Sequence, residues 1–231
     1  MHHPPTPPTG TSQAVPNDSV VVIAPQYCTP NQVDFHIAKK VEYLTEGNYN
    51  LGAFDINGNK IFIVTTKYYK RYRILLDAAG VPLVSLKKKN VSSSRWNVYR
   101  GDSENSKNLL FSVKKTTFLG FLAFKTNLDV FLASNRNEGV CDFKIKQKCN
   151  EKSCFIYRGN SDNLIATMHK KKTVQGKYFG KDTFLVTVYP NVDYAFVMAL
   201  CVVVDEINHG GEDIDNKDGA DDWVGWGGCG G

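Results

Sequence analysis

Residues 193–208 read DYAFVMALCVVVDEIN, and every position from Tyr194 to Val204 is apolar. Neither a helical nor a strand period leaves a polar face, so the segment must be surrounded by protein or by lipid. Spanning a bilayer takes about 20 apolar residues, whereas this run is bounded by Asp193 and Asp205. The stretch is therefore predicted to lie in the protein core, and the chain is predicted to have no transmembrane span.

The flanking residues favour a buried helix for this segment. Pro190 and Asn191 or Asp193 can begin and cap a helix, and residues 208–210 supply an Asn and Gly stop. The competing interpretation is a fully buried strand, which the β-branched residues 202–204 favour. In either form the segment would contribute strongly to the core, because it removes many large side chains from water.

Upstream of this segment, short apolar or alternating runs are separated by turn residues. Asn57-Gly58 within FDINGNKIFIV is a strong hairpin signal, because Asn-Gly tolerates the positive φ angles of a tight primed turn. The pattern predicts about ten to twelve strands joined as hairpins, with one helix. Further turns are expected at residues 78–82, 101–108, 147–152 and 159–163.

An internal repeat supports two related halves. YRGDS at residues 99–103 recurs as YRGNS at residues 157–161, and each is followed by an apolar strand that ends in basic residues. Phe111 and Ala166 should then share the inner face at matching positions, with Ser112 and Thr167 outside. We interpret the Arg-Gly-Asp triplet as turn chemistry, because its partner reads Arg-Gly-Asn in the same place.

The charge is unevenly distributed along the chain. The net charge is +5, but residues 209–231 carry −5, which leaves +10 for residues 1–208. A body this basic suits an anionic partner such as a phospholipid surface or nucleic acid. We expect a Pro/Thr-rich flexible leader at residues 1–19, one folded domain at residues 20–208, and a flexible Gly/Asp-rich tail at residues 209–231.

The six cysteines are predicted to be reduced thiols. Cys201 lies inside the apolar run, and the N-terminus does not resemble a secretory signal. These features favour a cytoplasmic protein that is monomeric, with a peripheral membrane or nuclear location as the alternative.

Several segments resemble the plant LURP-one-related family. They are FDINGN, RILLDAAGVPLVSLKKK, RWNVYRGDS, LDVFLASN, CDFKIK and above all GKDTFLVTVYPNVDYAFVMALCVVVDEIN. The family is similar in fold to the tubby C-terminal domain and the phospholipid scramblases. The resemblance implies an all-β fold, in which a closed antiparallel barrel of about twelve strands surrounds a buried hydrophobic C-terminal helix. It does not cover the tail after Asn208, and residues 118–124, FLGFLAF, are more apolar than it leads us to expect.

Signatures of catalysis and of metal binding are missing from the sequence. Nucleophile elbows, phosphate-binding loops, dinucleotide fingerprints and zinc-protease motifs do not occur. His36 and His169 fall in strand-like stretches and are interpreted as structural or surface residues. Residues 216–219 of the tail resemble part of a calcium-binding loop, but Ile214 and Gly225 occupy the positions where that loop has ligating carboxylates. We expect no enzyme activity, no cofactor and no metal site.

Basic clusters are the strongest candidates for a functional site. Each is predicted to follow a strand, so several could converge at one rim and bind phosphate head groups, with each lysine contributing about 1 kcal/mol near an anionic surface. The alternative is that strand-end lysines are solvated and guard against edge pairing. The residues are Lys87, Lys88, Lys89, Lys114, Lys115, Lys170, Lys171 and Lys172, with Lys67, Lys70, Arg71 and Arg73 nearby in sequence.

These observations predict a non-enzymatic module that binds anionic phospholipid head groups. Tubby domains bind phosphoinositides through basic residues, a property that the resemblance suggests without assigning it to residues of this chain. One alternative is a nucleic-acid-associated or transcription-linked regulator, although no stacking platform is visible in the sequence. A third is a lipid-handling activity like that of scramblases.

Overall fold

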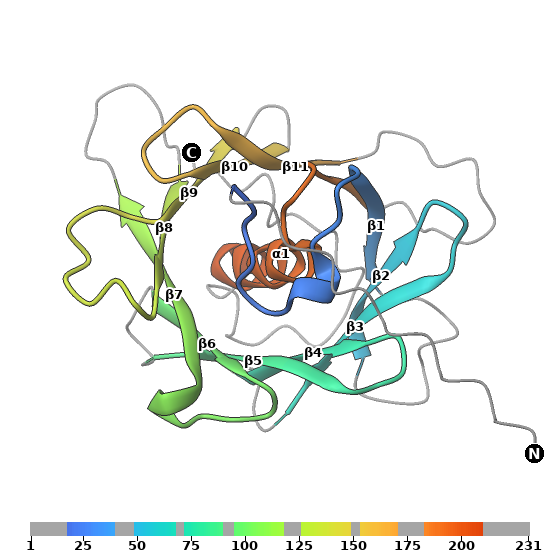
Figure 1. Ribbon diagram of the computed structural model, residues 1–231. Coiled ribbons are helices and arrows are strands. Elements are labelled where there is room, and N and C mark those ends of the chain that lie inside the picture. Colours follow the sequence, from blue (N-terminus) through green and yellow to red (C-terminus); the bar gives the residue numbers. More distant parts are fainter. Residues whose placement is uncertain are drawn as a thin grey trace, which may run out of the picture.

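The computed structural model describes residues 18–39, 49–67, 72–89, 95–117, 126–148, 153–170 and 183–209. Within these ranges twelve antiparallel strands close into a barrel, and each strand pairs with its neighbours in sequence until β12 meets β1 (Figure 1). The predicted all-β fold with hairpin connectivity is confirmed. The strands are β1 (Val33–Lys39), β2 (Tyr49–Asp55), β3 (Lys60–Thr66), β4 (Tyr72–Asp77), β5 (Pro82–Lys88), β6 (Arg95–Arg100), β7 (Leu109–Thr117), β8 (Thr126–Leu132), β9 (Phe143–Lys148), β10 (Ser153–Arg158), β11 (Leu164–Lys170) and β12 (Thr183–Val188).

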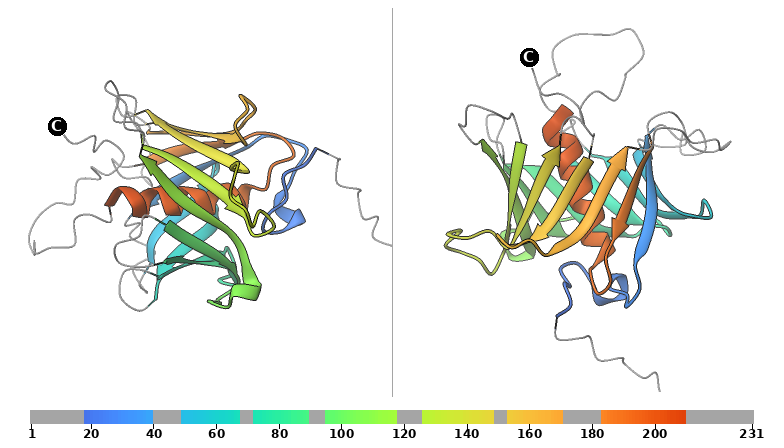
Figure 2. Two further views of the ribbon diagram at one scale, coloured as in Figure 1. Left: turned by 90° about the vertical axis from the view of Figure 1, so that its left-hand side faces the viewer. Right: turned by 90° about the horizontal axis from the view of Figure 1, so that it is seen from above.

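The apolar segment is a helix, α1 (Tyr194–His209), that runs along the inside of the barrel (Figures 1 and 2). The strand interpretation of this segment is therefore wrong. A helix enclosed by a barrel meets the wall on every side, which explains why residues 195–205 are all buried and why the sequence shows no polar face. Sixteen residues of helix extend about 24 Å. That length suits the strands, since all but the nine-residue β7 have six or seven residues and span about 20–23 Å.

Every second residue of the strands faces inward and builds the core around α1, although outward positions are also buried in strands such as β4 and β11. Phe111 and Val113 of β7 are fully buried, as are Ala166 and Met168 of β11, so the inward positions expected from the repeat are confirmed. The ring of Phe196 on the helix meets Phe111 edge-on at 5.1 Å and Phe143 at 5.0 Å, measured between ring centroids. Large aromatic side chains of β7 and β9 thus pack the barrel wall against the helix.

The two copies of the repeat occupy matching hairpins. Both Gly101 and Gly159 have positive φ, at 62° and 58°, which explains the glycine in each turn. The strand pairing also shifts register at the equivalent tyrosines, Tyr99 and Tyr157. Asp102 accepts hydrogen bonds from Lys67 and Tyr72, so the Arg-Gly-Asp triplet is held by intramolecular contacts, in agreement with its interpretation as a turn.

Asp193 joins the start of α1 to the N-terminal segment. Its Oδ1 caps the helix by accepting from the backbone N–H groups of Ala195 and Phe196, both at 3.0 Å. Its Oδ2 accepts from the N–H groups of Val22, Ile23 and Ala24 at 3.2, 2.7 and 3.1 Å. Burial raises the pKa of this carboxyl, and the amide donors oppose that rise by favouring the ionised form. The carboxylate therefore holds the N-terminal segment over one end of the barrel.

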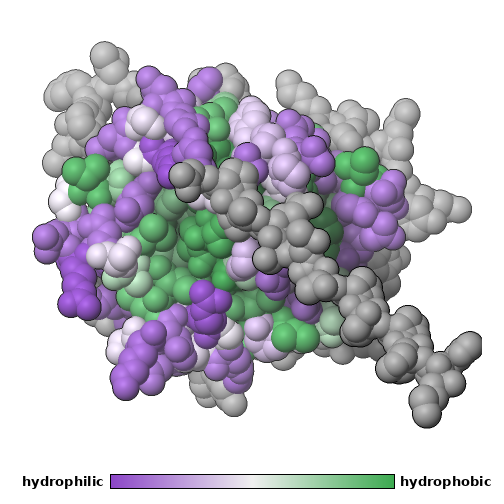
Figure 3. Space-filling view, viewed as in Figure 1, coloured by the Kyte–Doolittle hydropathy of each residue, from purple (hydrophilic) through white to green (hydrophobic). Residues whose placement is uncertain are grey.

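The end closed by this segment carries apolar side chains at its centre within a hydrophilic surround (Figure 3). The short 3₁₀ helix η1 (Pro25–Tyr27) lies here, over the start of α1 (Figure 1). Three strongly exposed apolar residues stand at turns of this end, namely Ile56 at 70%, Val140 at 62% and Val81 at 55%. The opposite end of the barrel surrounds the C-terminal part of α1 (Figure 2).

Some predicted features lie outside the described residues. These are most of the leader (1–17), the tail beyond residue 209, the apolar stretch 118–124, and Lys70, Arg71, Lys171 and Lys172. The structure gives no account of them.

Candidate functional site

The predicted lysines gather at the end of the barrel where the C-terminal part of α1 lies. Because neighbouring strands are antiparallel, the ends of β5, β7 and β11 fall at the same end of the barrel. This end, which we call the basic end, also holds Arg73, whose Nε lies 2.5 Å from Glu206 Oε1 of the helix. The predicted residues placed there are Lys87, Lys88, Lys89, Lys114, Lys115 and Lys170.

Lys89 directly follows β5, as the sequence predicted, whereas the other described lysines lie within the strands themselves, namely Lys87, Lys88, Lys114, Lys115 and Lys170. Alternation therefore divides them between the two faces. Lys88, Lys115 and Lys170 continue the inward rows and are half-buried near the end of α1, whereas Lys114 is exposed on the outer wall. Lys87 also faces outward and forms an ion pair with Glu104, so part of its charge is neutralised within the molecule.

The described charges give the barrel two unlike ends. At the basic end Asp205 and Glu206 of α1 lie among many lysines. Two acidic side chains from the opposite connections also reach back to this end, since Glu104 pairs with Lys87 and Glu138 pairs with Arg95. The other end carries acidic turn residues together with the basic residues Lys60, Arg100, Lys107, Arg136 and Arg158. The helix dipole attracts cations to a helix C-terminus, so the interaction of the lysines with the end of α1 is favourable. The acidic residues of the opposite connections are Asp55, Asp77, Asp102, Glu104, Glu138, Asp142 and Asp162, of which Asp102 pairs with Lys67 and Glu104 pairs with Lys87.

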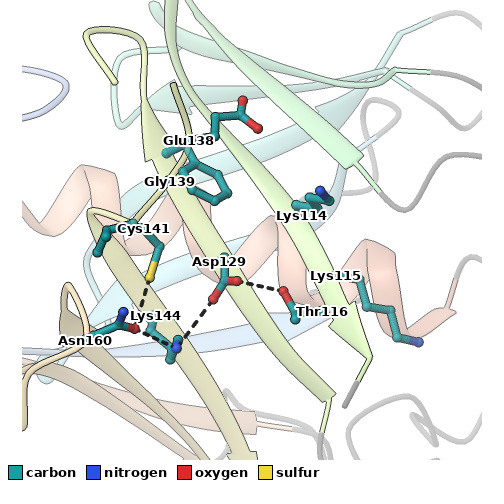
Figure 4. Close-up of a pocket in the computed structure, with 11 residues that line it drawn as sticks. Lys114, Lys115, Thr116, Asp129, Glu138, Gly139, Cys141, Lys144 and Asn160 are labelled. Atoms are coloured by element: carbon teal, nitrogen blue, oxygen red, sulfur yellow. Dashed lines mark hydrogen bonds and ion pairs between the residues drawn. The ribbon is translucent and has the colours of Figure 1, made fainter. Parts of the chain in front are cut away.

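A pocket of about 380 Å³ opens on the outer wall, between the lysines of β7 and the connections of the opposite end (Figure 4). Its floor is formed by β7, β8 and β9, and its margin by the β8–β9 connection and the β10–β11 turn. Asp129 lies at its centre, where Oδ2 accepts from the Thr116 hydroxyl at 2.8 Å and Oδ1 lies 3.9 Å from Lys144 Nζ. The lining residues are Lys114, Lys115, Thr116, Asp129, Phe131, Glu138, Gly139, Val140, Cys141, Lys144 and Asn160.

The margin of this pocket is fixed by an ion pair that crosses the outside of β7. The two terminal guanidinium nitrogens of Arg95, Nη1 and Nη2, donate to the Glu138 carboxylate, and Nη2 also donates to Ser112 Oγ at 2.6 Å. The hydrogen bond from Arg95 holds the pKa of Glu138 below its usual range. Burial raises the pKa of the neighbouring Cys141 thiol, which therefore stays protonated and unreactive near neutral pH.

This ion pair gives a pH-dependent prediction. Because the pKa of Glu138 is lower in the folded state than in the unfolded state, its contribution to stability is present above the unfolded value and is lost as pH falls through the folded one. Wild type should exceed a Glu138→Gln variant by about 1 kcal/mol at neutral pH. The difference should fade below about pH 4. Urea denaturation of both proteins from neutral to acid pH measures it, and a difference independent of pH would contradict the assignment.

Three lysines on the outer face of β9 were missed by the sequence reasoning. Lys144, Lys146 and Lys148 alternate with inward residues, so the pattern KIKQK carried a readable period-two signal. Lys146 lies over the Tyr157 ring at 4.5 Å and Lys148 over the Phe155 ring at 5.3 Å. Basic and aromatic side chains thus meet on the outer wall next to the pocket.

The two histidines do not form a catalytic pair. His36 of β1 and His169 of β11 both lie opposite Leu185 of β12, from its two sides. They are therefore separated by a strand, about 9.6 Å across the sheet. Within the described ranges no three His, Cys, Asp or Glu side chains are grouped to hold a metal ion. Cys28, Cys141, Cys154 and Cys201 are free thiols.

Comparison with known proteins agrees with this architecture. A family model described as LURP-one-related matches residues 33–205, which is most of the chain. The chain belongs to the LURP-one-related family. Protein LURP-one-related 15 of Arabidopsis thaliana is 45% identical over 196 residues, covering 84% of this chain and 88% of that protein. Protein LURP1 of the same plant is 40% identical over 194 residues, covering 83% and 91%.

A solved structure supports the fold of this LURP-one-related chain. An X-ray structure of an Arabidopsis thaliana protein superposes with a TM-score of 0.63 at 39% identity, covering 81% of this chain and 98% of the other. Among the helices that the structure describes, none is both long and apolar enough to cross a membrane.

Proposed function

We propose that this LURP-one-related barrel is a non-enzymatic module that binds anionic phospholipid through its basic end. The observation that carries the proposal is the convergence of lysines from β5, β7 and β11 at one end of the barrel, whereas acidic and basic residues are mixed at the other end. A charge distribution of this kind orients a protein on a negative surface. Each lysine near such a surface contributes about 1 kcal/mol, so several acting together suffice for reversible attachment.

The same architecture supports a relation to tubby-type and scramblase-type barrels, in which a helix also lies within the barrel. Transfer of lipid through the barrel is disfavoured, because fully buried residues such as Phe196 and Val203 of α1 fill its interior. We therefore propose attachment to a lipid surface and not lipid transport.

Nucleic acid is the second candidate ligand, favoured by the lysines and rings on β9 and β10. Aromatic side chains bind bases when a ring face is open for stacking. Here the faces of Tyr157 and Phe155 are partly covered by Lys146 and Lys148. We therefore rank this candidate below phospholipid.

Co-sedimentation of the full chain with vesicles tests the proposal. The variant K88S/K89S removes two charges from the basic end, and K60S/K107S removes two from the opposite end as a matched control. We expect the first variant to bind phosphatidylserine or phosphoinositide vesicles at least tenfold more weakly than wild type, from about 1 kcal/mol for each lysine. Binding should weaken with salt, and the control should match wild type. Equal pelleting of both variants would contradict the proposal.

A further inference from the structure

We propose that the acidic segment 212–222 of this chain binds the basic end of its own barrel and competes there with an anionic ligand. Its net charge is −5, from six carboxylates and one lysine, whereas residues 1–208 carry +10. The contact follows from charge and position alone, and its inhibitory role rests on the proposed function. The charged residues of the segment are Glu212, Asp213, Asp215, Lys217, Asp218, Asp221 and Asp222.

Four lysines at the basic end have no ion pair among the described contacts. We call Lys88, Lys89, Lys114 and Lys115 the lysine cluster. They come from the ends of β5 and β7, which flank β6 in the sheet, so the two groups lie about 9.6 Å apart. Lys89 and Lys114 are exposed, and the other two are half-buried at the mouth of the barrel. The cluster therefore presents four positive charges close together.

The acidic side chains near the lysine cluster have other partners. The hydrogen bond from Arg95 has the largest effect in lowering the pKa of Glu138, and Lys114 and Lys89 add smaller effects. Asp205 also lies at this end but is buried in α1. The described part of the barrel thus leaves positive charge in excess. The ion pairs are Glu104 with Lys87, Asp129 with Lys144, Glu138 with Arg95 and Glu206 with Arg73.

Helix α1 delivers the acidic segment to this end of the barrel. The helix ends at His209, and its C-terminal part lies at the basic end (Figure 2). Twelve strands spaced about 4.8 Å apart and tilted by about 40° form a barrel of about 12 Å radius. An extended chain covers about 3.3 Å per residue, so about four residues reach from the axis to the rim. The segment begins three residues beyond the helix, and its carboxylates are therefore within reach of the lysine cluster.

Covalent linkage makes this contact effective although each exposed ion pair is weak. A binding segment on a short tether acts at an effective concentration in the millimolar range. An anionic ligand must displace the segment, so its apparent affinity falls in proportion to the fraction of molecules with an open basic end. A segment that is bound about four-fifths of the time weakens ligand binding about fivefold.

Tryptophan fluorescence of the full chain tests the contact without any ligand. Trp223 and Trp226 follow the acidic segment, and the third tryptophan, Trp96, is buried and gives a constant background. Acrylamide, a neutral quencher, should quench the tail tryptophans about twofold less at low salt than at about 0.5 M salt, because salt screens the contact. Quenching should be high at both salt concentrations in the amide variant, E212Q/D213N/D215N/D218N/D221N/D222N.

A matched pair of lysine variants locates the contact. K88S/K89S removes two charges from the lysine cluster and should raise quenching at low salt toward that of the amide variant. K60S/K107S removes two charges from the opposite end and should keep the protection of wild type. Quenching should not depend on protein concentration, because the segment and the lysines belong to one chain.

Three outcomes of the quenching experiment would overturn the contact. The first is equal quenching of wild type and the amide variant at low salt. The second is protection that K88S/K89S leaves intact, which would place the segment on another surface. The third is protection that grows with protein concentration, which would place it on another molecule.

Co-sedimentation with phosphatidylserine vesicles separates the contact from the proposed function. If both hold, the amide variant should bind vesicles about fivefold more tightly than wild type. Tighter binding without a difference in quenching would reflect the higher net charge alone and would overturn the contact. If neither protein binds vesicles while the wild-type tail tryptophans are protected, the proposed function fails and the contact stands.

Discussion

Replacing Asp193 with alanine is expected to lower the free energy of unfolding by about 3–5 kcal/mol, a large part of the stability of a single domain. The carboxylate is fully buried and accepts five backbone N–H groups, two from the start of α1 and three from residues 22–24. Alanine would leave these donors without a partner at a buried site. The midpoint of urea denaturation, measured by circular dichroism, reports the loss.

Two variants control this experiment. Asp193→Asn keeps an acceptor for one group of donors and should lose about half as much stability. Asp34→Ala removes an aspartate whose partners are the side chains of Gln32 and Thr187, at 3.0 and 2.7 Å, and it should lose less than about 1 kcal/mol. A loss for Asp193→Ala no larger than that for Asp34→Ala would show that the carboxylate does not join the helix to the N-terminal segment.

Much of this architecture is readable from local sequence. The apolar run and its flanking cap predicted α1, and Asp193 is indeed the capping residue. Two-residue alternation predicted the inward positions of β7 and β11, and the Gly in YRGDS marked a turn with positive φ. These signals depend on residues a few positions apart, so a single sequence contains them. Closure of the barrel rested on family resemblance, because strand pairing between β1 and β12 joins distant segments.

The candidate site was less readable for the same physical reason. The lysine clusters are visible as runs, but only the barrel topology shows that they share one end, and Glu104 as the partner of Lys87 comes from a different hairpin. The wall pocket is lined by residues of three strands and two connections, so no local sequence pattern predicts it. Asp193 shows the same limit, because its role as a helix cap was predictable whereas its contacts to residues 22–24 were not.

The second large effect is expected for Phe196→Ala, which should cost about 3–5 kcal/mol. Phe196 is fully buried on α1, and its ring packs against Phe111 of β7 and Phe143 of β9. The variant loses both the transfer free energy of the ring and two aromatic contacts, and it leaves a cavity. The closed barrel can relax only partly into that space, because every strand is hydrogen-bonded on both sides.

Phe155→Ala is the matched control, since it deletes the same side chain from the half-buried outer wall, where the ring contacts His169 at 5.6 Å. It should cost about 1 kcal/mol, and urea denaturation of both variants measures the contrast. A cost for Phe196→Ala no greater than that for Phe155→Ala would mean that α1 adds little to the core and that the barrel wall is stable without it. The expected contrast instead makes the helix the main apolar surface on which the wall packs, so weakening it should destabilise the whole barrel in one transition.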